Sequence, residues 1–234
     1  GLAKQGLNPL PVFVASLKDP IAAATLETLL VDAPPDVILN ATGFAYSPPG
    51  IERVRGPYDC TPGDDGECEA GPPVLQIVFS GGNADGWREG MRGLSARDIA
   101  MNVALPEVDG RVLTRAVSFK GLARRDPLTE TDIVRYEPVA DRVDFVCALT
   151  KAWADLRRTP PEDRRIGLVL ANYPNRDGRI GNGVGLDTPA GAVEMLRAMH
   201  EAGYNTGDIP ADGEALIARM LAGPTNDFKN LAGR

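Results

Sequence analysis

The order of strand-like and helix-like segments constrains this chain more than any other feature. Apolar segments at 11–17 and 37–42 predict two strands, and residues 21–31 between them predict a helix that begins at Asp19 and Pro20. A strand, a helix of about 12 residues and a second strand form a βαβ unit. We expect the crossover of this unit to be right-handed.

The alternation continues along the chain and predicts the fold class. Further strands are predicted at 74–80, 116–120 and 165–173, and further helices at 90–105, 140–158, 188–203 and 213–222. This order predicts an α/β fold with a mainly parallel sheet and helices on both faces. Ligands bind such sheets at the carboxyl ends of the strands. The candidate ligand loops therefore follow Thr42, Ser80, Lys120 and Ala171.

Two α/β lobes are expected, with their boundary in the polar, Pro-containing stretch 124–138. The first lobe would span 1–125 and carry a Gly/Pro/Asp-rich insertion at about 45–73. The second would span 126–234 and would be incomplete, because the chain stops in Gly, Pro, Asn and Lys without a final strand. This ending predicts a segment of a larger multidomain protein.

Composition narrows the class of protein. The chain is 43% hydrophobic and 24% charged, as soluble globular proteins are, and its formal charge of −7 argues against a nucleic-acid groove. No apolar run approaches the length of about 18 residues that a membrane helix needs, and no export signal is visible. Three cysteines predict free thiols in a reducing compartment, with a disulfide or metal pair of Cys60 and Cys68 as the alternative. A cytoplasmic protein without nucleic-acid or membrane partners is expected.

The most informative segment is the loop 172–189, which is longer than the roughly two to six residues such a connection needs. Its glycines allow the backbone to approach a ligand, and its arginine side chains suit carboxylates. The segment follows a predicted strand and precedes a helix for which Thr188 is the expected N-cap, so it predicts a site for an acidic small molecule. A flexible surface loop is the alternative. The candidate substrate-binding residues are Asn172, Asn175, Arg176, Asp177, Arg179 and Asn182.

A second candidate site is the acidic segment 104–110, which we expect to be an extended loop. Glu107 and Asp109 would then reach the same space, and both are candidate catalytic residues. Glu107 could hold a divalent metal or accept a proton from a ligand. A solvated acidic turn is the alternative. His200 has no metal-ligand neighbours in sequence and is expected at the surface or as a helix cap.

Several segments together resemble the CobN-type large subunit of aerobic, ATP-dependent cobaltochelatase. They are 6–19, 37–45, 94–110 and the loop 172–189. The resemblance runs in order from about Gly6 to Asn226, and Asn-Tyr-Pro-Asn-Arg-Asp-Gly-Arg-Ile-Gly-Asn-Gly is its most specific string. The related large (H) subunit of magnesium chelatase shares the Pro-Glu-x-Asp-Gly pattern of 106–110.

The resemblance implies a ligase that forms nitrogen–metal bonds and depends on partners. Co²⁺ would be the substrate metal, inserted into the corrin precursor hydrogenobyrinic acid a,c-diamide in cobalamin biosynthesis. Two smaller AAA-type subunits would bind ATP and Mg²⁺, in keeping with the lack of a P-loop motif here. The chain would be an internal fragment that needs the rest of the large subunit and is inactive alone. The alternatives are a scaffold or partner-docking domain of that subunit, the porphyrin magnesium chelatase, or a periplasmic-binding-like domain for sugars or amino acids.

Overall fold

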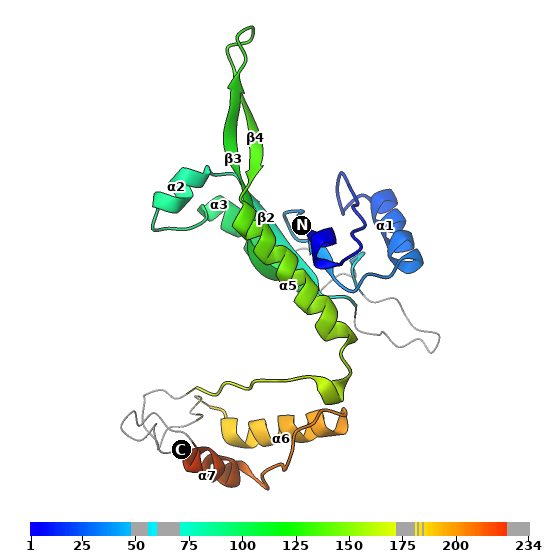
Figure 1. Cartoon of the computed structure of the whole chain (residues 1–234), viewed down its shortest axis with the longest axis vertical. Coiled ribbons are helices and arrows are strands. Elements are labelled where there is room, and N and C mark those ends of the chain that lie inside the picture. Colours follow the sequence, from blue (N-terminus) through cyan, green and yellow to red (C-terminus); the bar gives the residue numbers. More distant parts are fainter. Residues whose placement is uncertain (48–55, 60–70, 172–180, 182, 184, 224–234) are drawn as a thin grey trace. The chain divides into compact units, whose positions relative to one another are not determined.

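A computed structural model of the chain describes residues 1–47, 56–59, 71–171, 181, 183 and 185–223 (Figure 1). The chain forms two compact units, Gly1–Arg157 and Arg158–Arg234. Each unit has its own packing.

The first unit is built on a four-stranded sheet. Its strands, in spatial order, are β1 (Ile38–Asn40), β2 (Val74–Ser80), β3 (Val112–Arg125) and β4 (Asp132–Pro138). The pairs β1–β2 and β2–β3 are parallel, whereas β3–β4 is antiparallel. The strands predicted at 37–42, 74–80 and 116–120 are thus confirmed, as is the mainly parallel α/β class.

The strands β3 and β4 continue as a hairpin beyond the end of β2 (Figure 1). Ser80, the last residue of β2, pairs with Phe119, whereas β3 extends to Arg125, which pairs with Asp132. The expected lobe boundary at 125/126 therefore falls inside this hairpin, and the two compact units divide at Arg157 and Arg158. Most residues of the outer hairpin are exposed. Its many charged residues, with Pro127 and Pro138, indicated a boundary, although Val134 and Tyr136 alternate with charged residues as in a strand.

The helices of the first unit begin with the 3₁₀ turn η1 (Leu2–Gln5) and α1 (Pro20–Asp32). The predicted cap of α1 is confirmed, because the Asp19 carboxylate accepts a hydrogen bond from the Ile21 N–H at 2.9 Å. After β2 come α2 (Ala84–Glu89), α3 (Ala96–Ile99), the π-helical turn η2 (Ala100–Ala104) and α4 (Leu105–Val108). The last of these helices, α5 (Ala140–Arg158), coincides with the predicted helix 140–158.

The core of the first unit lies against β2 and β3. Val78, Ala116 and Phe119 are buried together, and Trp87 of α2 packs against them. The Trp87 and Phe119 ring centroids lie 5.0 Å apart. Arg142 of α5 donates to the Ala116 carbonyl, and its guanidinium carbon lies 4.4 Å from the Trp87 ring centroid. These contacts attach α5 to the sheet and to α2.

The strand predicted at 11–17 is wrong. The segment is irregular, with the Phe13 side chain 95% exposed and Leu17 buried. A short apolar run fits a strand or an irregular segment equally well. Among the strands that the structure describes, none pairs with this segment.

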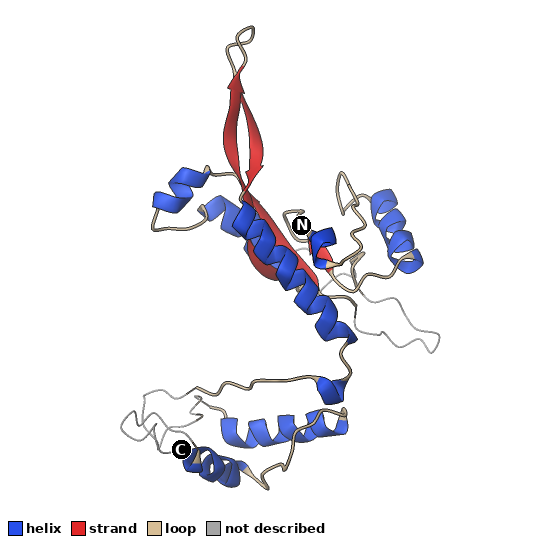
Figure 2. Cartoon of the chain, viewed as in Figure 1, coloured by secondary structure: helices blue, strands red, loops and turns tan. Residues whose placement is uncertain are grey.

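The described part of the second unit consists of helices and irregular connections (Figure 2). The helices are η3 (Pro161–Asp163), α6 (Thr188–Glu201) and α7 (Gly213–Ala222), which confirm the predictions at 188–203 and 213–222. The N-cap of α6 is Asp187 rather than the expected Thr188. The strand predicted at 165–173 is absent as far as the structure describes it, through Ala171, and Val169 is 93% exposed there.

Candidate functional site

The structure describes Glu107 and Asp109 of the predicted site. Cys60 and Cys68 lie outside the described residues. So do the predicted substrate-binding residues Asn172, Asn175, Arg176, Asp177, Arg179 and Asn182. Of the same loop, Gly181 is described, and its N–H donates to the Ala171 carbonyl at 2.8 Å.

Glu107 and Asp109 lie at the end of α4 in different surroundings. The expected extended loop is wrong, because Pro106 accepts from the Asp109 N–H at 3.1 Å and Glu107 from the Gly110 N–H at 2.9 Å, as in a helical turn. Gly110 follows with a positive φ of 73°, which ends the helix at a position that suits glycine. Glu107 is exposed to solvent, whereas the Asp109 side chain is 11% exposed.

Among the described residues, donors from two parts of the chain engage the Asp109 carboxylate. It accepts from the Tyr46 N–H at 2.6 Å, the Ser47 N–H at 3.0 Å and Arg111 Nη2 at 2.8 Å. The Arg111 side chain is only 2% exposed, so Asp109 balances a buried positive charge. Asp109 therefore anchors the loop after β1 to the end of α4, and Glu107 is the carboxylate that reaches solvent there.

A buried polar network covers the carboxyl end of β1. Asn40 Nδ2 donates to Gln76 Oε1 at 2.6 Å, and Gln76 Nε2 donates to the Thr42 carbonyl at 3.1 Å. The same carbonyl accepts from Arg111 Nη1 at 3.3 Å, and the Tyr58 hydroxyl donates to Asn40 Oδ1 at 3.2 Å. Burial raises the pKa of Tyr58 above its ordinary value of 10.0, while the Arg111 guanidinium acts in the opposite direction. These bonds engage the Thr42 carbonyl at the start of the expected ligand loop.

The loop after Ser80, also predicted as a ligand loop, borders a pocket of about 670 Å³. Apolar and polar side chains line this pocket, among them Trp87, Leu94, Ile99, Asn83, Ser95 and Arg92. This volume lies within the range of about 300–1,000 Å³ that is typical of small-molecule sites. The pocket is therefore a second candidate for ligand binding in the first unit.

Buried hydrogen bonds fix two sides of this pocket. Asp98, 5% exposed, accepts from Ser80 Oγ at 2.7 Å and from the Gly81 N–H at 3.0 Å. Ser95 Oγ caps α3 by accepting from the Asp98 N–H at 3.1 Å. The start of α3 is thereby tied to the end of β2. Sequence reasoning missed this arrangement, although Ser-x-x-Asp at 95–98 is a helix-start pattern that could have indicated it.

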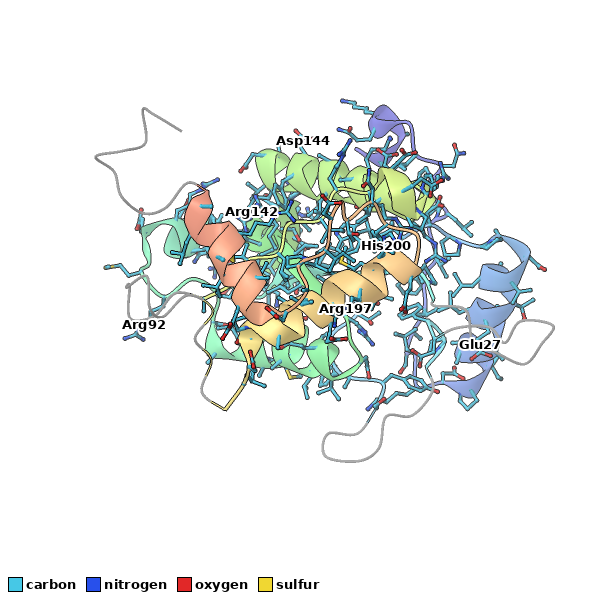
Figure 3. All side chains as sticks on the ribbon, turned by 90° about the horizontal axis from the view of Figure 1, so that it is seen from below. Glu27, Arg92, Arg142, Asp144, Arg197 and His200 are labelled. Atoms are coloured by element: carbon cyan, nitrogen blue, oxygen red, sulfur yellow. The ribbon has the colours of Figure 1, made fainter. Side chains whose placement is uncertain are left out.

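Among the residues that the structure describes, no group of three or more His, Cys, Asp or Glu side chains could hold a metal ion. His200 lies in the last turn of α6, with Nδ1 3.3 Å from Thr206 Oγ1 (Figure 3). None of the helices in the described part is long and apolar enough to span a membrane.

Comparison with known proteins places the chain in a family. The family model described as CobN/Magnesium Chelatase matches residues 1–234. The aerobic cobaltochelatase subunit CobN of a Sinorhizobium species is 53% identical over 225 residues, which cover 96% of this chain and 17% of that protein. The subunit of the same name from Pseudomonas aeruginosa is 47% identical over 230 residues, or 98% of this chain and 18% of that protein.

A solved structure agrees with these matches. The catalytic subunit of cobaltochelatase from Mycobacterium tuberculosis superposes with a TM-score of 0.70 and 33% identity, over 94% of this chain and 18% of that chain. This chain thus spans less than a fifth of each relative's length. The match along its whole length, in sequence and in fold, shows that the chain belongs to the CobN/magnesium chelatase family.

Proposed function

We propose that this chain is part of the tetrapyrrole-binding large subunit of a cytoplasmic cobaltochelatase. That subunit inserts Co²⁺ into hydrogenobyrinic acid a,c-diamide in cobalamin biosynthesis. The observation that carries the proposal is the 53% identity, along 96% of the chain, to an aerobic cobaltochelatase subunit CobN.

The proposal divides the work among several chains. Because this chain corresponds to 17–18% of its relatives' length, the rest of the large subunit completes the macrocycle site. Two smaller AAA-type subunits bind ATP and Mg²⁺ and couple ATP hydrolysis to metal insertion. Co²⁺ is a substrate of the reaction, and the product is the cobalt corrin.

Within this scheme Glu107 is the candidate catalytic residue. Cobalt insertion breaks a ring N–H bond and forms nitrogen–cobalt bonds, so a base must accept the released proton. An exposed carboxylate is suited to that role, or to handing over the metal. Asp109 and Arg111 support Glu107 indirectly, because their ion pair fixes the turn that ends α4. Arg176 and Arg179 are assigned to the acidic side chains of the macrocycle, on the basis of their charge and the glycines near them.

The first test is cobalt insertion by the full-length large subunit, combined with its partner subunits and ATP. We expect Glu107→Gln to lower the insertion rate by about 100-fold or more, because general acid–base groups contribute about that much. Affinity for the corrin precursor should stay near the wild-type value. Glu27→Gln is the matched control, since Glu27 is an exposed glutamate of α1 (Figure 3). Wild-type insertion rates in Glu107→Gln would refute this role.

Titration with two macrocycles separates the remaining alternatives. Preferential binding of the corrin precursor over protoporphyrin by the full-length subunit supports the cobaltochelatase assignment. Preference for protoporphyrin, with Mg²⁺ insertion, would instead indicate a magnesium chelatase. If neither macrocycle binds, the proposed function fails.

A further inference from the structure

We infer that the pocket after β2 binds one edge of the tetrapyrrole. In this arrangement Trp87 contacts the ring system and Arg92 pairs with a carboxylate at its periphery. The inference rests on the proposed function and adds to it a binding site made of residues with no role so far.

The lining of the pocket suits an amphipathic ligand. Trp87, Leu94 and Ile99 provide apolar surface, and Asn83 and Ser95 provide polar groups. Small-molecule sites typically combine apolar walls with a few placed polar groups. A tetrapyrrole has the matching character, because it carries acidic side chains around a flat, largely apolar ring.

Trp87 is held in place from within the protein. The Trp87 ring packs against the buried Phe119 ring, with the two centroids 5.0 Å apart. The Arg142 guanidinium carbon lies 4.4 Å from the Trp87 ring centroid. Arg142 is in turn fixed by its bond to the Ala116 carbonyl. Trp87 is nevertheless half-buried and lines the pocket. A fixed aromatic wall loses little conformational entropy when a flat conjugated ligand packs against it.

Arg92 places a positive charge at the rim of the pocket. Its side chain is exposed and projects outward from the ribbon (Figure 3). In the part of the chain that the structure describes, no carboxylate pairs with Arg92, whereas the nearby Arg88 pairs with Asp85 at 3.4 Å. The planar guanidinium can therefore take a ligand carboxylate in a bidentate pair.

The pocket is formed before any ligand arrives. The bonds from Ser80 and Gly81 to the buried Asp98 hold the end of β2 and the start of α3 together. Ser80 and Ser95 of the pocket lining are thereby held in place relative to each other. The same chemistry, a flat group with negative charge, also describes a purine nucleotide, so the test must distinguish the two.

The test measures the dissociation constant of hydrogenobyrinic acid a,c-diamide for the full-length large subunit, by absorbance titration. We expect Arg92→Ala to weaken binding about tenfold, as the loss of a charge-assisted pair does. Trp87→Phe, which keeps an aromatic ring at this position, should weaken binding severalfold. Arg88→Ala and Trp153→Phe are the matched controls, since Arg88 of α2 and Trp153 of α5 do not line the pocket, and both should bind as the wild type does.

A macrocycle with esterified carboxylates provides a second readout. Wild type and Arg92→Ala should bind it equally, because the charge that Arg92 recognises has been removed. If the wild type binds the free acid and both pocket variants bind it equally well, the inference is wrong and the proposed function stands. If ATP displaces the macrocycle from the wild type and binds Arg92→Ala poorly, the pocket is a nucleotide site and the inference is also wrong. If the wild type binds no macrocycle, the proposed function fails with it.

Discussion

Arg111 carries its charge into the interior of the first unit, and Asp109 is the carboxylate that balances it. The two side chains are 2% and 11% exposed and lie 2.8 Å apart. Arg111 Nε has no hydrogen-bond partner in the described structure, so the guanidinium depends on the bonds that remain. We predict that Asp109→Asn lowers the free energy of unfolding by about 3–5 kcal/mol, because removing one partner leaves a buried charge uncompensated.

Urea unfolding of the chain measures this change, and a surface pair provides the control. Arg88 and Asp85 are 57% and 84% exposed, so Asp85→Asn should change the free energy of unfolding by about 0.5 kcal/mol or less. Equal losses in the two variants would mean that the Asp109–Arg111 pair is not the anchor described above.

Tyr58 gives the same network a pH dependence. Burial raises its pKa above 10.0 in the folded chain, so the neutral hydroxyl favours the folded state. This contribution is present in full below the ordinary pKa of about 10 and is lost as the pH rises through the folded value. We predict that the stability advantage of the wild type over Tyr58→Phe shrinks above pH of about 10, as measured by urea unfolding. A difference that stays constant or grows with pH would contradict the raised pKa.

At the scale of elements, the start of α6 follows directly from the residues of the predicted ligand loop. Asp187 accepts from the Ala190 N–H at 3.1 Å and so satisfies one of the amides at the helix end. We predict that Asp187→Ala destabilises α6 by about 1 kcal/mol, whereas Asp187→Asn, which keeps a cap oxygen, stays close to wild type. Hydrogen exchange of the α6 amides measures both. Equal exchange in Asp187→Ala and wild type would show that the cap contributes nothing.

Elements with strong local signals could be predicted from the sequence. β2, α5 and α7 match their predicted bounds, since buried apolar runs, helical periodicity and end signals all act within the segment itself. β4 and the outer part of β3 were missed because 124–138 is rich in charged residues and contains Pro127 and Pro138, although β4 also carries exposed apolar side chains such as Val134 and Tyr136. The apolar run 11–17 was misassigned because a strand also needs a partner, which no local pattern supplies.

In the candidate sites, too, residue types could be predicted from the local sequence, but contacts between distant segments could not. Glu107 and Asp109 could be chosen from their spacing alone, but their separate roles depend on contacts with Tyr46, Ser47 and Arg111. The pocket after β2 lies at the carboxyl end of a parallel strand, where ligands are expected to bind in α/β sheets. Its aromatic wall could not be predicted, since it requires α5 to bring Arg142 onto Trp87.

At the scale of the whole chain, the two compact units have cores of different kinds. The first, Gly1–Arg157, surrounds a sheet with buried residues such as Val78 and Phe119. In the second, Arg158–Arg234, α6 and α7 pack together in the described part, with Ala192 and Val193 of α6 buried. Since each unit makes most of its contacts internally, loss of structure in one need not spread to the other.

We therefore predict that destabilising the first unit leaves the second folded. In Asp109→Asn, hydrogen exchange followed by mass spectrometry should show faster exchange in β2 and α5, because the global opening of the first unit becomes easier. Amides of α6 and α7 should exchange at wild-type rates in the same sample. Asp187→Ala supplies the reciprocal control: exchange should become faster in α6 and stay at the wild-type rate in β2. If α6 loses protection as fast as β2 in Asp109→Asn, the two units unfold as one, and the boundary between Arg157 and Arg158 does not separate independent folding units.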